Sequence, residues 1–387
     1  MMRDFEALLA CLPGNGWDWA GMRRIAPLDR LLQAMADTPQ QPEWHGEGDV
    51  LTHTRRVCEA LSGHPEFQSM SADARTALAL AALLHDVGKP RCTRLEDGRL
   101  IAPHHGPVGA QIARSLLWRD LGLCGTPRSQ AIREAACLYV RYHTKPLRFI
   151  DGAARETDLL RLAANGELTG LFTLRGLCLL AEADRLGSVA ADNPEMLERV
   201  ALGRELAREA GCLDALYPFP SPVAQRRLFA GGQVWKDQSL YDDTWGEVTL
   251  MCGLPGTGKD TWIRQNCPGL PVVSLDDLRA SLGVAPQDNQ GPVVQAAREQ
   301  ARGYLRARQP FVWNATSLTV LRDQQVALFE QYHARVRIVF LETDWRENLR
   351  RNADREAAVP EAVISRMLDR LEPPERWEAR NVRWICV

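Results

Sequence analysis

The amino-acid sequence predicts two domains, an all-α domain followed by an α/β domain with a parallel sheet. In the first half, helix-length segments carry apolar residues at three- and four-residue spacing, the period of an amphipathic helix. After about Asp243, short β-rich runs alternate with helix-length segments, which is typical of parallel strands joined by crossover helices. The length of 387 residues fits two or three domains of roughly 150 residues each.

The expected elements divide the chain into four parts. These are an N-terminal segment (1–24) packing on the helical domain, the helical domain (25–216), a linker (217–243) that begins with a proline-rich stretch, and the α/β domain (244–387). The helices expected in the first half cover residues 27–36, 50–61, 71–85, 107–118, 129–143 and 168–186. The strands expected in the second half cover residues 248–252, 272–275, 311–313 and 336–341.

Composition indicates a folded cytoplasmic protein with no membrane partner. Apolar residues make up 45% and charged residues 25% of the chain, which argues against intrinsic disorder. No run approaches 18 apolar residues, and the first residues lack the apolar core of a signal peptide. The ten cysteines include no CxxC pair and fit a reducing compartment better than a disulfide scaffold. The net charge of −2 neither indicates nor excludes a nucleic-acid partner.

Histidines and aspartates in the helical half predict a metal site. Seven of the eight histidines fall within the first 143 residues. Neutral imidazoles and carboxylates are good ligands for first-row transition metals, and an adjacent His-Asp pair can serve two metals with the aspartate bridging. A bound metal lowers the pKa of water towards about 7, which provides a nucleophile at neutral pH. The candidate residues, in chain order, are His53, His85, Asp86, Lys89, His105, His143 and Asp184.

A lone histidine on an apolar helix is more often a core or surface residue, and we interpret His64 and His333 in that way. The ordered set is more specific, and Lys89, about one turn beyond Asp86, could hold a phosphate oxygen against the metals.

These residues resemble those of the HD-domain phosphohydrolases, and in particular the HD module of bacterial CCA-adding tRNA nucleotidyltransferases. The resemblance covers roughly residues 25–215 and implies a 2′,3′-cyclic phosphodiesterase and 2′- or 3′-phosphatase. It implies one metal on His53, His85, Asp86 and Asp184, and a second on His105 and His143, with Asp86 bridging. Manganese, cobalt, nickel, copper and zinc suit such ligands better than magnesium. The sequence departs from relatives that have two histidines where Tyr142-His143 stands, and His104 beside His105 leaves that ligand open.

A glycine-rich segment in the second half predicts a phosphate-binding loop. It has the GxxxxGK pattern between an expected strand and an expected helix, so its backbone N–H groups would face phosphate oxygens. Lys259 would reach the β- and γ-phosphates of a nucleotide. Asp260 stands where a serine or threonine usually follows the lysine, so that magnesium would be held mainly through water. The segment consists of Gly253, Leu254, Pro255, Gly256, Thr257, Gly258, Lys259, Asp260 and Thr261.

Two further segments suggest that this loop belongs to a kinase. Asp276 follows the second expected strand, where it could accept the proton of an attacking hydroxyl, and Arg279 could clamp a substrate phosphate. An aspartate after a strand is also a common helix cap. Arginines 346, 350, 351 and 355 follow the last expected strand, where a lid could close over a triphosphate, although such a run is usually a solvated face.

Together these segments resemble the polynucleotide 5′-hydroxyl kinases over about residues 244–375. The resemblance implies Asp276 as general base, Arg279 as a ligand of acceptor phosphate, Arg351 and Arg355 as lid arginines, and ATP or another NTP with magnesium as donor. Asn314 stands where relatives can have aspartate.

An HD domain joined to such a kinase resembles the bacterial HD-Pnk family of bifunctional end-healing enzymes. The resemblance implies RNA or DNA with broken ends as substrate and a ligase acting downstream. Two alternatives stay open at this point: a kinase–phosphohydrolase acting on a small nucleotide or sugar, and a nucleotide-sensing regulator with a vestigial HD site.

Overall fold

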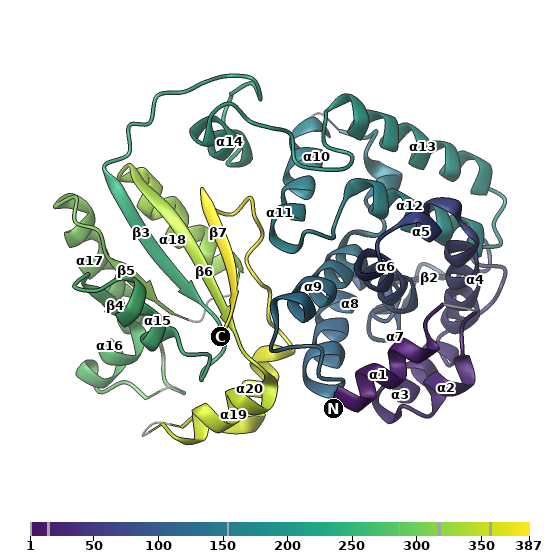
Figure 1. Ribbon diagram of the computed structural model, residues 1–387, viewed down its shortest axis with the longest axis horizontal. Helices are drawn as coiled ribbons and strands as arrows, with labels where there is room; N and C mark the ends of the chain where they lie inside the picture. The colour runs from purple at the N-terminus through teal and green to yellow at the C-terminus, as the bar shows by residue number, and fades with distance from the viewer. Residues whose placement is uncertain (1, 14–15, 153–154, 286, 316–318, 356–357) are drawn as a thin grey trace. The chain divides into compact units, whose positions relative to one another are not determined.

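A computed structural model describes residues 2–13, 16–152, 155–285, 287–315, 319–355 and 358–387 (Figure 1). The chain divides into two compact units, Met1–Tyr217 with Leu368–Arg370 and Pro218–Met367 with Leu371–Val387. The first unit is helical and the second contains a five-stranded parallel sheet, which confirms the predicted fold class. Among the helices described, none is long and apolar enough to cross a membrane.

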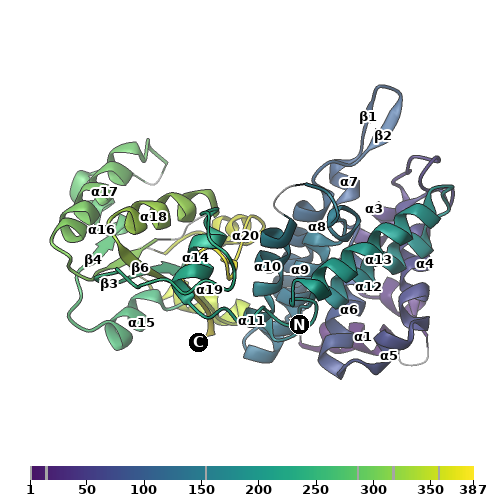
Figure 2. The ribbon, with the colours of Figure 1, turned by 90° about the horizontal axis from the view of Figure 1, so that it is seen from above.

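The helical unit is built from short and medium helices, with one small hairpin that projects from it (Figure 2). The hairpin strands are β1 (Arg94–Glu96) and β2 (Arg99–Ile101). The helices are α1 (Met2–Cys11), α2 (Trp19–Arg23), α3 (Ala26–Ala36), α4 (Val50–Gly63), α5 (Pro65–Ser69), α6 (Ala72–Leu84), α7 (Lys89–Cys92), α8 (His105–Ser115), α9 (Pro127–Tyr142), α10 (Arg155–Ala164), α11 (Gly166–Thr169), α12 (Leu174–Gly187) and α13 (Asn193–Glu209).

Side-chain caps fix where the main helices of this unit begin. In each of four helices, a side chain just before the first turn accepts a hydrogen bond from a backbone N–H of that turn. The capping residues are Asp49 for α4, Ser71 for α6, Thr126 for α9 and Thr173 for α12. These caps satisfy donors that have no partner within the helix. Trp17, from the N-terminal segment, donates its indole N–H to the carbonyl of Cys58 in α4 at 3.0 Å.

The prediction of one helix over residues 168–186 is wrong in where the helix starts. Gly170 ends α11 with a φ of +67°, a left-handed conformation that interrupts a right-handed helix. A new helix, α12, begins at Leu174 after the Thr173 cap. The apolar spacing continues across this break, so periodicity alone did not reveal it. The segment expected as a linker also contains a helix, α14 (Pro222–Phe229), which Ser221 caps.

The sheet of the second unit has the strand order β4-β5-β3-β6-β7, and each neighbouring pair is parallel. The fifth strand, β7, was not predicted. The strands are β3 (Gly246–Cys252), β4 (Val272–Ser274), β5 (Val312–Asn314), β6 (Ala334–Glu342) and β7 (Asn381–Cys386). The other helices of the unit are α15 (Lys259–Asn266), α16 (Leu275–Leu282), α17 (Gly291–Arg306), α18 (Thr319–Gln331), α19 (Trp345–Ala353) and α20 (Glu361–Leu368).

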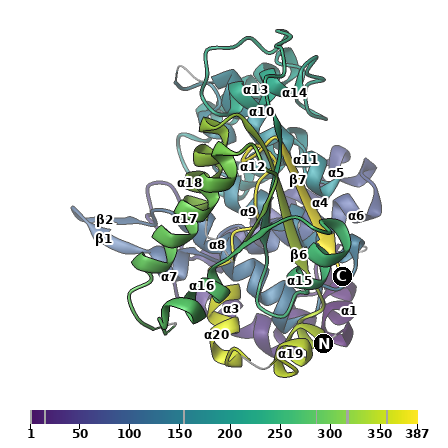
Figure 3. The same ribbon diagram turned by 90° about the vertical axis from the view of Figure 1, so that its left-hand side faces the viewer.

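Helices cover both faces of this sheet, with α15 on one side and α17 and α18 on the other (Figure 3). Ile263 of α15 packs in one cluster with Met251 of β3 and Val339 of β6. On the opposite face, the ring of Phe329 from α18 lies 5.4 Å from that of Phe311 and 5.8 Å from that of Trp313. Because β3 is central and buried, the loop that follows it starts from a rigid base at the carboxyl edge of the sheet.

A glycine at the end of α12 allows that helix to approach α4. A Cβ atom on Gly187 would lie 2.6 Å from Cγ2 and 2.8 Å from the backbone nitrogen of Val57, whereas a Cβ atom on Gly63, at the end of α4, would meet no atom within 4 Å. Gly187→Ala should therefore lower the free energy of unfolding of the helical unit by about 1–3 kcal/mol through overpacking. Gly63→Ala should leave stability unchanged or slightly higher. Thermal melts compare the two variants, and equal melting temperatures would contradict the close approach.

Candidate functional site

Six residues of the helical unit converge on one buried cluster, although they come from five regions of the chain. His53 lies in α4, His85 caps the end of α6 and Asp86 follows it. His105 begins α8, His143 caps the end of α9, and Asp184 lies in α12. We call His53, His85, Asp86, His105, His143 and Asp184 the His–Asp cluster.

The carboxylate of Asp86 lies at the centre of the cluster and divides it into two halves. Its Oδ2 is 3.2 Å from Nε2 of His85 and 3.7 Å from Nε2 of His53. Its Oδ1 is 3.4 Å from Nε2 of His105 and 3.8 Å from Nε2 of His143. Each carboxylate oxygen thus faces its own pair of imidazoles.

Backbone carbonyl groups orient three of these imidazoles. In each case Nδ1–H donates to the carbonyl oxygen three residues earlier, so that Nε2 is left with its lone pair facing the cluster. A carbonyl oxygen can only accept, so these contacts fix the tautomer, as is usual for histidines that bind metals. The pairs are His85–Ala82 at 2.9 Å, His105–Ala102 at 2.7 Å and His143–Val140 at 2.8 Å.

The fourth imidazole, that of His53, is held by carboxylates on both sides. Its Nε2 lies 3.0 Å from Oδ1 of Asp184, and its Nδ1 lies 2.8 Å from Oε1 of Glu47. Glu47 was not among the predicted site residues. Its carboxylate is almost fully buried, also contacts Nδ1 of His45 at 2.9 Å, and accepts the backbone N–H of Val189 at 2.7 Å.

The environment keeps most of the cluster in the protonation state that binds cations. Burial, with the neighbouring imidazoles of His105 and His85, lowers the pKa of His143 to about 3, so this ring is neutral. Burial opposes ionisation of Asp86, yet Lys89 and the imidazoles hold the pKa of this carboxyl well below its usual range. Burial would lower the pKa of His53, but its contacts with Asp184 and Glu47 raise that pKa to about 9. A metal binding at His53 would therefore release a proton.

The residues present fit a metal centre. Among the described residues, neither carboxylate oxygen of Asp86 accepts a hydrogen bond of normal geometry, although both oxygens are buried. Burying an ionised group without such partners is costly unless a cation compensates it. A donor set of imidazole nitrogens and carboxylate oxygens suits first-row divalent transition metals.

Lys89 places a positive charge at the edge of the cluster. Its Nζ lies 2.8 Å from Oδ2 of Asp86 and donates to Oε1 of Gln40 at 2.5 Å. The preceding Gly88 leaves no space for a side chain, because a Cβ atom there would lie 2.1 Å from the carbonyl oxygen of His105. His104 is exposed, so the structure brings His105 and not His104 into the cluster.

In the second unit, the predicted phosphate-binding loop joins the end of β3 to α15. Gly253, Gly256 and Gly258 adopt φ values of +140°, +85° and +87°, which other residues rarely adopt. The ammonium group of Lys259 donates to the carbonyls of Gly253 and Leu254, both at 2.9 Å. Burial lowers the pKa of Lys259 to about 8, and the charges of Asp260, Arg355 and Asp276 also act on it.

The proposed acceptor residues lie on α16, directly after β4. Ser274 caps this helix by accepting the N–H of Asp277 at 3.2 Å. The exposed carboxylate of Asp276 pairs with Arg279, whose Nε also donates to Oε1 of Gln290 at 2.9 Å. The pair presents one negative and one positive group at the carboxyl edge of the sheet.

The arginines of α19 differ in their surroundings. Arg350 is exposed and forms ion pairs with Glu347 and Asp354. Arg351 also contacts Glu347, but its Nη1 lies 3.6 Å from the position that a Cβ atom would take on Gly258. Asn348 ties the same helix to the loop by donating to the carbonyl of Pro255 at 2.9 Å. Arg351 therefore borders the phosphate-binding loop, whereas Arg350 belongs to the solvated face.

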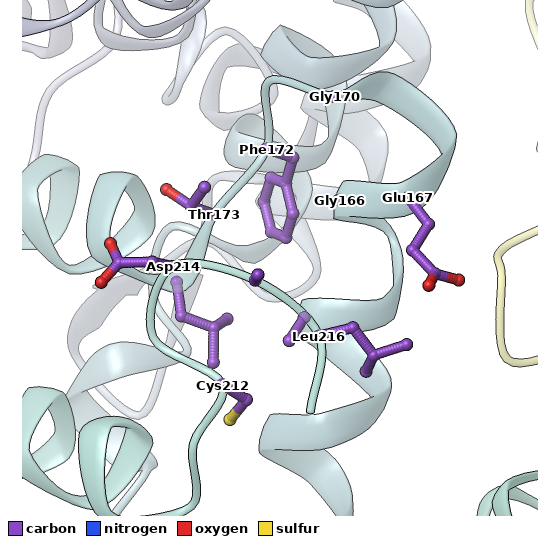
Figure 4. Close-up of a pocket in the computed structure, with 11 residues that line it drawn as sticks. Gly166, Glu167, Gly170, Phe172, Thr173, Cys212, Asp214 and Leu216 are labelled. Carbon is purple, nitrogen blue, oxygen red and sulfur yellow. The ribbon is translucent and has the colours of Figure 1, made fainter. Parts of the chain in front are cut away.

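A separate pocket of about 250 Å³ lies in the helical unit, beside α11 and the segment 212–216 (Figure 4). Phe172 and Leu216 contribute apolar surface, and Asp214 is held by Arg175 at 2.5 and 2.7 Å. None of the residues of the His–Asp cluster lines it.

Comparison with known proteins identifies two domain types. Residues 49–187 match the HD domain family, and residues 248–374 match an AAA domain family. The multifunctional CCA protein of Halorhodospira halophila (strain DSM 244 / SL1) is 32% identical over 135 residues. That match covers 34% of this chain and 28% of that protein. The chain therefore joins an HD domain to a P-loop kinase-like domain.

The buried position of Glu47 leads to a prediction about metal affinity. Glu47→Gln removes the negative charge that orients His53, and such outer contacts typically change metal affinity by about 10- to 100-fold. We expect weaker Mn²⁺ binding by roughly that factor, measured by calorimetry on the metal-stripped protein. Glu59→Gln, at an exposed position of α4, is the matched control and should bind as the wild type does. If both variants bind Mn²⁺ with equal affinity, Glu47 stabilises only the conformation of its own loop.

Proposed function

We propose that this protein heals broken ends of RNA or DNA. The HD domain would hydrolyse 2′,3′-cyclic phosphate, 2′-phosphate and 3′-phosphate ends, and the kinase-like domain would phosphorylate 5′-hydroxyl ends with ATP or another NTP. The observation that carries the proposal is the presence in one chain of a two-sided His–Asp cluster and of a glycine-rich phosphate-binding loop with the Asp276–Arg279 pair at the same edge of the sheet. This combination resembles the bacterial HD-Pnk family.

In the HD domain, the cluster would hold one divalent ion on each side of Asp86. When bound, such ions polarise phosphate oxygens and activate water for attack on phosphorus. The protein supplies the rest: three backbone carbonyls and Glu47 fix the imidazoles, and the ammonium of Lys89, 2.8 Å from Asp86, can donate to a phosphate oxygen. A 3′-hydroxyl end would be the product.

In the kinase-like domain, each predicted residue has a distinct task. The loop N–H groups and Lys259 would hold the β- and γ-phosphates. Asp276 would accept the proton of the attacking 5′-hydroxyl, and Arg279, which pairs with it, would orient that carboxylate and bind acceptor phosphate. Arg351 and Arg355 would stabilise the charge of the transferring phosphoryl group.

The two chemistries complement each other. Ligases commonly need a 3′-hydroxyl and a 5′-phosphate, whereas breaks often leave a cyclic or 3′-phosphate and a 5′-hydroxyl. One chain with both activities would convert the second pair of ends into the first, and a ligase could then act on the product.

One substrate tests the proposal directly. An oligonucleotide that bears a 5′-hydroxyl and a 2′,3′-cyclic phosphate is incubated with the protein, ATP, Mg²⁺ and Mn²⁺, and the masses of the products are determined. We expect gain of a 5′-phosphate and loss of the terminal phosphate. A mononucleoside is assayed in parallel. Phosphorylation of the mononucleoside alone would favour a small-molecule kinase, and turnover of neither would favour a nucleotide-sensing regulator.

The two activities should separate by mutation, because the two sites share no residue. His85→Ala or Asp86→Ala should abolish phosphoesterase activity by removing metal ligands while 5′-phosphorylation persists. Lys259→Ala or Asp276→Ala should abolish 5′-phosphorylation while 3′-end processing persists. Circular dichroism verifies that each variant is folded. Loss of kinase activity in folded His85→Ala protein would contradict the model of two independent sites.

The arginines beside the loop should contribute to catalysis rather than to nucleotide binding. Arg351→Ala and Arg355→Ala should each lower kcat for phosphoryl transfer by roughly 10³-fold, whereas ATP should still bind. Arg350→Ala removes an exposed arginine of the same helix as Arg351 and should leave kcat close to that of the wild type. If all three variants keep wild-type kcat, these arginines belong to a solvated face.

A further inference from the structure

We propose, on the basis of the kinase function above, that Asp260 and Asn314 form the binding site for the divalent cation that accompanies the nucleotide. In P-loop proteins this cation is usually held by a hydroxyl directly after the loop lysine and by an aspartate on a neighbouring strand. Here the two side-chain types are exchanged: the carboxylate follows the lysine, and an uncharged amide stands on the strand.

Asp260 and Asn314 are in direct contact, although they lie 54 positions apart. Asp260 is the second residue of α15, and Asn314 is the last residue of β5. Nδ2 of Asn314 donates to Oδ1 of Asp260 at 2.7 Å. Asn314 pairs in register with Met251 on one side and Ser274 on the other. The contact therefore lies at the carboxyl edge of the sheet, between the strand that leads to the phosphate-binding loop and the strand that leads to Asp276.

The free atoms of this pair are oxygens. Oδ1 of Asn314 is buried and, among the residues that the structure describes, has no hydrogen-bond partner. A buried amide oxygen without a partner is costly, and a water molecule of a hydrated cation would supply the missing donor. Since Oδ1 of Asp260 accepts the amide N–H, Oδ2 is the oxygen of this carboxylate that would bind the cation itself.

The two hydroxyl groups of the loop are engaged elsewhere. The hydroxyl of Thr257 is buried and donates to the carbonyl of Leu254 at 2.9 Å. Thr261 is exposed, and its hydroxyl accepts a hydrogen bond from Arg264 at 3.0 Å. Magnesium prefers oxygen ligands and typically uses one or two carboxylates besides water and phosphate. Asp260 is the residue of the loop that offers such a carboxylate.

The exchange also preserves the local charge. A hydroxyl and a carboxylate together carry one negative charge, and so do a carboxylate and an amide. Two carboxylates at a distance of 2.7 Å would repel each other, whereas an amide stabilises its neighbour by a hydrogen bond. The amide at position 314 is therefore the residue type that a carboxylate at position 260 requires.

The test measures cation binding without turnover. The affinity for ATP is measured with and without Mg²⁺, and Mn²⁺ binding in the presence of ATP is followed by electron paramagnetic resonance. Asp260→Asn keeps the size of the side chain and removes its charge. The variant with both Asp260→Ser and Asn314→Asp restores the usual arrangement. Asp277→Asn, which removes an exposed carboxylate of α16, is the matched control.

We expect Asp260→Asn to reduce the Mg²⁺-dependent gain in ATP affinity by about tenfold or more, the size of effect seen when support of a metal ligand is lost. Metal-free ATP binding should be unchanged, which also shows that the loop is folded. The double variant and Asp277→Asn should show a gain within about threefold of the wild type.

A full Mg²⁺-dependent gain in Asp260→Asn protein would overturn the site and leave Asp260–Asn314 as a structural contact between α15 and β5. If the double variant lacks the Mg²⁺-dependent gain in ATP affinity, the proposal that positions 260 and 314 have exchanged their side-chain types is wrong. Failure of the wild-type protein to bind ATP with Mg²⁺ would instead overturn the kinase function, and the cation site with it.

Discussion

The helical unit depends on one buried carboxylate, that of Asp86. An ionised carboxyl group away from water is tolerated only where positive or hydrogen-bonding groups surround it. Here the ammonium of Lys89 lies 2.8 Å away and four imidazoles surround the carboxylate, an arrangement of nitrogen and oxygen donors that a bound cation would complete. These groups come from α4, the ends of α6 and α9, and the starts of α7 and α8. The ends of these helices therefore have to lie close together around one carboxylate.

In the α/β unit, the parallel sheet, and not a buried charge, brings the candidate residues together. Its groups are held by the carboxyl ends of parallel strands, which meet at one edge because β3, β4, β5 and β6 run in the same direction. Four parts of the unit lie at this edge: the loop after β3, the helix after β4, the last residue of β5 and the helix after β6.

The features that depend on local spacing in the sequence were predicted, whereas those that depend on contacts between distant residues were missed. His85-Asp86 and the loop ending at Lys259 could be predicted because their chemistry requires fixed spacings on a helix end or a strand–loop–helix turn. Glu47 could not, since its place beside His53 depends on a contact with Val189, far along the chain. The same holds for β7, which pairs at the edge with β6 and carries the exposed Arg383 within its short span. The assignment of residues to particular roles in catalysis stays a prediction.

The two sites differ in the type of atom that they offer to a cation. The His–Asp cluster offers mostly imidazole nitrogens, which favour first-row transition metals. The loop of the second unit offers the carboxylate of Asp260 and an amide oxygen, which suit a hydrated magnesium ion with nucleotide phosphates. Magnesium competes poorly for nitrogen ligands, so an excess of it would not displace a transition metal from the first site. One chain could therefore hold both kinds of ion at once, because each site selects by its ligands rather than by the supply of metal.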